Sequence, residues 1–228
     1  MEPSKRLRNI GFITFFLSGI CAISSGVIVS LLQESCGFSF SMTGTLLSCM
    51  SIGNMAAAFL SGFLPRYLGV RKTVLILCAG YFIGYLATAL TGLPVLLLTS
   101  FLLIGLAKGC ALNRCTVLVG TNSSDRNRGM QVMHACYAVG AMLCPLLITI
   151  LLRFSQTLPM IGIAIMGLLL WLIFFSAGLI KPVEFPVVGF GIIGILLGLF
   201  CLFGSGISRL YPEQAVSDIG RILLLIIF

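Results

Sequence analysis

The feature that most constrains this chain is a series of long apolar runs joined by short polar segments. The runs cover residues 10–32, 42–64, 73–90, 95–119, 130–152, 158–180 and 185–207. A helix needs about 20 apolar residues to cross a bilayer, whereas the strands of a membrane barrel alternate over about 10 residues. Lipid offers no partner for bare backbone amides, so such runs must be helical. We therefore predict an all-α integral membrane protein, a bundle of about seven transmembrane helices.

Composition supports a lipid environment. Hydrophobic residues make up 59% of the chain and charged residues 9%, whereas soluble domains carry roughly 25% charged residues. The net charge of +8 would favour nucleic-acid binding in a soluble protein. Here the cations form short clusters between apolar runs, where they orient helices and meet anionic headgroups. The predicted partner is a lipid bilayer, and nucleic acid is not expected.

The distribution of positive charge predicts the orientation. With a cytoplasmic amino terminus, nine cations fall on the inner side and three on the outer side, excluding the two inside the fourth run. The inner ones are Lys5, Arg6, Arg8, Arg66, Arg71, Lys72, Arg126, Arg128 and Lys181. The outer ones are Arg153 and Arg209, with Arg221 as the third if the tail stays outside. Cytoplasmic loops carry an excess of Lys and Arg. We therefore expect a multi-pass protein of the plasma (inner) membrane with its amino terminus in the cytoplasm.

The sequence gives no support for an enzyme, a metal site or a cofactor. Most of the nine cysteines lie inside apolar runs, where thiols behave as small hydrophobes, and no Cys-x-x-Cys pair occurs. The single histidine is His134. A Gly-rich phosphate loop, paired buried carboxylates and a nucleophile–base motif are all absent from the sequence.

The basic turn after the second run carries the most information. It contains Gly62, Arg66, Gly69, Arg71 and Lys72. Gly62 permits close helix approach, Gly69 permits a tight turn, and the cations hold the turn in the cytoplasm. This pattern resembles the signature loop between helices two and three of the major facilitator superfamily. Arg66 replaces the acidic residue by which that family connects its two halves. A plain basic turn is the alternative interpretation.

The fourth and fifth runs extend the resemblance. Gly105, Gly109 and Asn113 repeat every four residues and share one helix face, where small residues allow close packing. The segment 134–145 then contains a histidine, a Gly-Ala pair and a proline. This combination resembles the fucose-permease-like branch of the superfamily.

The resemblance implies a domain organisation. Residues 1–181 would form a six-helix transporter half built as two inverted three-helix repeats. Residues 182–228 would hold a further transmembrane helix and an incomplete hydrophobic tail. Within them, residues 204–212 are similar to the Gly-rich stretch ending in Tyr-Pro of helix ten, which suggests a truncated or internally deleted transporter. A plain seventh helix is the alternative.

Polar side chains inside the apolar runs are the candidate site residues. The predicted substrate-binding residues are Lys108, Asn113, Arg114, Gln131, His134 and Tyr137. A charge at the bilayer centre costs about 2.5–3.5 kcal/mol on insertion scales, so it usually faces a cavity or a partner. Lys108 is the leading candidate, because Arg114 lies nearer a helix end and can snorkel. His134 also fits a hydrogen-bonded core residue. Asn113 and Asn54 suit a solute or another helix, with helix packing favoured for Asn54.

These residues predict movement of a small polar solute by alternating access. Two cations without buried acids would suit an anionic solute. The resemblance implies that transport also needs a second six-helix half, as a separate partner or in a homodimer. The alternative is a non-transporting membrane scaffold or an inactive transporter fragment.

Overall fold

The computed structural model describes residues 5–177, which form seven helices and contain no strand. Their bounds are α1 Lys5–Cys36, α2 Phe40–Phe63, α3 Pro65–Leu68, α4 Val70–Leu90, α5 Pro94–Asn122, α6 Arg126–Leu152 and α7 Leu158–Ser176. The predicted domain boundary at residue 181 and the predicted helix over 185–207 lie outside the described residues.

Six of the helices within residues 5–177 are long and apolar enough to cross a membrane. They coincide with the first six predicted runs, which confirms the all-α membrane bundle. Some helices begin several residues before the apolar runs do: α1 starts at Lys5 and α6 at Arg126. Polar residues continue the helix where it leaves the hydrocarbon, and the Asp125 side chain caps α6 by accepting from the Arg128 amide at 3.2 Å.

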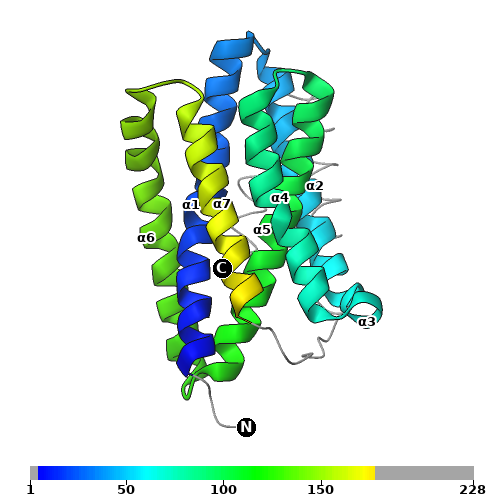
Figure 1. The fold of residues 1–228 in the computed structure, drawn as a ribbon, viewed down its shortest axis with the longest axis vertical. Helices are drawn as coiled ribbons and strands as arrows, with labels where there is room; N and C mark the ends of the chain where they lie inside the picture. The colour runs from blue at the N-terminus through cyan, green and yellow to red at the C-terminus, as the bar shows by residue number, and fades with distance from the viewer. Residues whose placement is uncertain (1–4, 178–228) are drawn as a thin grey trace, which may run out of the picture. The chain divides into compact units, whose positions relative to one another are not determined.

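The helices pair in a pattern that repeats. α2 packs mainly on α5, and α6 packs mainly on α1, while α4 packs on both α5 and α7 (Figure 1). Exchanging α1 with α5, α2 with α6 and α4 with α7 interchanges the α2–α5 and α1–α6 contacts and keeps the α4–α7 contact. It turns the α4–α5 contact into the α1–α7 contact, which is also present but smaller. α1 begins at the end of this unit that carries the amino terminus, and α5 begins at the opposite end. The architecture is therefore two inverted three-helix repeats.

Glycines allow the closest approaches in both repeats. A Cβ on Gly105 of α5 would lie 2.8 Å from the Met50 carbonyl carbon of α2. In the equivalent pair, a Cβ on Gly19 of α1 would lie 3.2 Å from the Ala141 amide nitrogen of α6. Real Cβ atoms essentially never approach within 3.0 Å, so only glycine permits this spacing at Gly105. Small residues at such contacts replace the hydrophobic driving force that lipid does not provide.

Two fully buried tyrosines of α4 connect that helix to α1. The Tyr81 hydroxyl lies 3.2 Å from the Ser18 hydroxyl. The Tyr85 hydroxyl accepts a hydrogen bond from Ser24 at 3.0 Å and donates to the Cys21 carbonyl. Each of these buried hydroxyls thus has a partner, as an apolar interior requires.

The loops divide the cations between the two ends of the described bundle. The amino-terminal end carries Lys5, Arg6, Arg8, Arg66, Arg71, Lys72, Arg126 and Arg128, and Arg153 lies at the opposite end. The side of the membrane that each end faces remains a prediction.

Candidate functional site

Lys108 lies at the midpoint of α5. It is fourteen residues from each end of the helix Pro94–Asn122, which places it about 21 Å from either end at 1.5 Å per residue. Its side chain is partly buried and makes no hydrogen bond or ion pair with any residue that the structure describes. A cation at this depth without a protein partner is a candidate for binding a solute.

The contacts of α5 define the direction in which Lys108 leaves the helix. Gly105 and Gly109 pack against α2. Cys115 is seven residues beyond Lys108 and therefore on the same stripe, and its carbonyl oxygen lies 3.8 Å from the Cβ position of Gly11 on α1. Lys108 therefore lies on the side of α5 between its contacts with α2 and with α1.

The two asparagines of the α2–α5 contact have different surroundings. The Asn113 amide donates to the Ser61 hydroxyl of α2 at 3.1 Å, so this predicted binding residue connects two helices. Asn54 was expected to serve helix packing. Its Oδ1 lies 2.9 Å from the Cβ position of Gly109, yet its amide makes no hydrogen bond within residues 5–177. Sequence alone carried no signal that would have distinguished the two amides.

Arg114 lies on a different face of α5 from Lys108. Ala107, seven residues earlier on the Arg114 stripe, has its Cβ 3.4 Å from the Cβ position of Gly80 on α4. Arg114 is only 8% exposed, and its Nε has no hydrogen-bond partner in the described part of the chain. The two cations of α5 therefore do not form one paired site.

Two of the three α6 candidates contact α1. His134 meets the ring of Phe15 edge-on at 5.6 Å between centroids, and the Tyr137 ring is tilted against the same ring at 5.1 Å. His134 and Gln131 are exposed, and Tyr137 is partly buried. α6 and α2 flank the central helices α1 and α5 from opposite sides (Figure 1). The structure thus separates Asn113, at the α2–α5 contact, from His134 and Tyr137, at the α1–α6 contact, and Arg114 belongs to neither place.

The signature loop folds around the short helix α3 and is fastened to α7. Gly69 adopts φ +79°, a conformation that residues with a side chain rarely adopt. The Arg71 guanidinium donates to the Phe175 carbonyl at 3.4 Å and lies 5.3 Å from the centre of the Phe175 ring. Arg66 and Lys72 are exposed, and Gly62 is partly buried.

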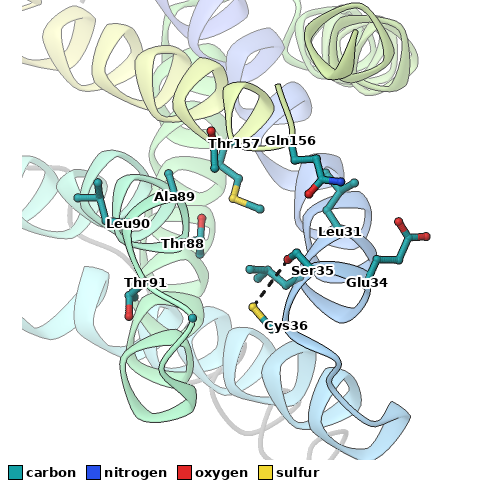
Figure 2. A pocket seen from close by; sticks show the side chains of 13 residues that line it. Leu31, Glu34, Ser35, Cys36, Thr88, Ala89, Leu90, Thr91, Gln156 and Thr157 are labelled. Atoms are coloured by element: carbon teal, nitrogen blue, oxygen red, sulfur yellow. Dashed lines mark hydrogen bonds between the residues drawn. The ribbon is translucent and has the colours of Figure 1, made fainter. Parts of the chain in front are cut away.

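An open cleft of about 210 Å³ lies at the end of the described bundle opposite the amino terminus (Figure 2). It is bordered by the ends of α1 and α4 and the start of α7, with Ser35, Cys36, Thr88, Gln156 and Thr157 among its lining residues. None of the predicted substrate-binding residues lines this cleft. Between residues 5 and 177, no cluster of His, Cys, Asp or Glu is suited to holding a metal ion.

Six apolar helices in two inverted repeats define a multi-pass α-helical membrane protein. The family model of the Major Facilitator Superfamily matches residues 11–189, most of the chain. The chain therefore belongs to the Major Facilitator Superfamily. A curated protein named gallate transporter, from Pseudomonas putida, is 29% identical over 121 residues. Those residues are 53% of this chain and 27% of the relative, so the match spans about a quarter of the relative's length.

Proposed function

We propose that this chain forms one six-helix half of an alternating-access transporter for a small organic anion, with Lys108 holding the negative charge of the solute. The observation that carries the proposal is the position of Lys108, halfway along a membrane helix and without a counter-charge among residues 5–177. A bound anion would offset the cost of that charge, about 2.5–3.5 kcal/mol on insertion scales.

The family and the relative support this choice of solute. Members of the superfamily to which the chain belongs are built from repeats that rock around a site near the bilayer midplane. The position of Lys108 at the midpoint of α5 fits that depth. The relative is named for gallate, a hydroxylated aromatic carboxylate. A small carboxylate therefore fits both the charge at Lys108 and the chemistry of the relative's solute.

The distribution of loop charges supports the proposed orientation. The end of the bundle that carries the amino terminus gathers most of the loop cations of residues 5–177. By the positive-inside rule, this end would face the cytoplasm in the proposed plasma-membrane location. A second six-helix half would supply the opposite wall of the pathway. That half would contact the broad exposed surfaces of α2 and α6, whose most apolar segments are each only 17% buried in this unit.

Uptake of radiolabelled gallate into liposomes that contain the purified full chain tests the proposal. In the liposomes a second copy of the chain would supply the other half, so the wild-type chain should take up gallate saturably. Lys108→Gln should lower the initial rate at least about tenfold, because hydrogen bonds to charged groups contribute about 1.5–3 kcal/mol. Lys5→Gln removes the same charge from the exposed start of α1 and should transport normally. Equal rates for the wild-type chain and Lys108→Gln would exclude a role for Lys108. The absence of uptake by every variant would favour a non-transporting membrane protein.

A further inference from the structure

We infer that Asn54 of α2 and Lys108 of α5 form a single carboxylate-binding subsite, with Lys108 supplying the charge and the Asn54 amide donating a directional hydrogen bond. The inference rests on the proposed transport of an anion and assigns the residue that recognises the shape of the carboxylate. Asn54 lies on α2 and Lys108 lies on α5, so the subsite would span the contact between these two helices.

The first support is proximity. Asn54 packs against two turns of α5: its backbone nitrogen lies 3.0 Å from the Cβ position of Gly105, and its Oδ1 lies 2.9 Å from that of Gly109. Residues three or four apart on a helix are surface neighbours, with Cβ atoms about 5–6 Å apart. Lys108 is three residues from Gly105 and adjacent to Gly109, so its flexible side chain begins within one turn of the Asn54 amide.

The second support is that both groups lack partners. In the described part of the chain, the Asn54 side chain makes no hydrogen bond, and the Lys108 side chain makes neither a hydrogen bond nor an ion pair. Hydroxyls elsewhere on α2 are satisfied by the carbonyl four residues earlier, as seen for Thr45, Ser48, Ser51 and Ser61. An unsatisfied polar group costs several kcal/mol in hydrocarbon. Two such partly buried groups, on turns where α2 and α5 pack together, therefore indicate a place that a polar ligand fills.

The third support is the chemistry of the pair. A carboxylate only accepts hydrogen bonds, and Lys108 and the Asn54 amino group both donate. With Oδ1 against Gly109, the amino group of Asn54 is left to donate. An aspartate at position 54 would instead neutralise Lys108 and remove the net charge that attracts an anion. The uncharged amide therefore suits a site that must keep its positive charge for the ligand.

Equilibrium binding of benzoate to the full chain in lipid nanodiscs tests the subsite, with uncharged benzamide as the matched ligand. Asn54→Ala should weaken benzoate binding about tenfold, the effect of about 1.4 kcal/mol. Asn54→Asp should abolish benzoate binding. Ser51→Ala, which alters an exposed hydroxyl bonded to its own helix, should bind normally. Benzamide should bind much more weakly than benzoate to the wild-type chain.

A thermal-unfolding cycle tests the proximity independently of any ligand. Asn54→Asp should raise the unfolding temperature by forming an ion pair with Lys108, and the gain should vanish in a Lys108→Gln background. No gain would place the two side chains too far apart and refute the subsite. Wild-type benzoate affinity in Asn54→Ala, with binding lost in Lys108→Gln, would overturn the subsite but leave the anion proposal standing. Failure of the wild-type chain to bind benzoate would contradict both.

Discussion

Replacement of Gly53 by alanine tests whether the close contact between α2 and α5 holds the bundle together. A Cβ at this position would lie 3.0 Å from the Leu106 amide nitrogen and 3.2 Å from the Gly105 Cα, and still closer to the Leu102 carbonyl oxygen. All three are backbone atoms, which cannot rotate away, so the helices would have to separate. Overpacking of this kind costs typically 1–3 kcal/mol.

A glycine on the exposed side of the same helix supplies the control. A Cβ on Gly44 would meet nothing within 4 Å, so Gly44→Ala changes only helix propensity, which favours alanine by roughly 0.8–1.0 kcal/mol. Gly53→Ala gains the same propensity and adds the packing cost. The difference in stability between the two variants should therefore be about 1–3 kcal/mol, with Gly53→Ala the less stable.

Thermal unfolding in detergent, followed with a thiol-reactive dye, measures this difference. The dye reports unfolding because Cys78 and Cys110 are buried in the folded bundle. For chains of this size, 1 kcal/mol shifts the midpoint by roughly 2–4 °C. Gly53→Ala should therefore unfold at least about 2 °C below Gly44→Ala. Coincident midpoints would show that α2 and α5 do not pack as closely as the structure indicates.

Two further predictions concern the buried tyrosines and the orientation. Tyr85→Phe removes the bonds to Ser24 and Cys21 and should cost about 0.6–1.7 kcal/mol, from the average to the maximum found for hydrogen bonds between membrane helices. Tyr67→Phe, at an exposed position, should leave the unfolding midpoint unchanged, and equal midpoints for the two variants would argue against the bonds. Exposed Cys36 should react with an impermeant maleimide on intact cells, and reaction only in inverted vesicles would reverse the proposed orientation.

The sequence predicted the helices well because the bilayer imposes a simple physical rule. A run must be long enough to cross the hydrocarbon and must satisfy its own backbone, so its position can be read from apolar length alone. The second run, predicted over 42–64, forms the helix Phe40–Phe63. The basic turn was harder, because the one-turn helix α3 inside it depends on local proline and glycine geometry and not on hydropathy.

The site was less predictable because it depends on how helices meet. Asn54 and Asn113 are both amides inside apolar runs, and only the register between α2 and α5 places Ser61 opposite Asn113 and leaves Asn54 without a partner. Whether Lys108 on α5 lies near His134 on α6 likewise depends on which helices are neighbours. The length of an apolar run carries no information about the register between two helices or about which helices are neighbours.

The central claim is that the unpaired charge of Lys108 holds an anion inside the membrane. Equilibrium binding of gallate to the full chain in nanodiscs, compared between the wild-type chain, Lys108→Arg and Lys108→Gln, measures this most directly. Binding should persist in Lys108→Arg, which keeps the charge, and should weaken at least about tenfold in Lys108→Gln. Wild-type affinity in Lys108→Gln would contradict the account.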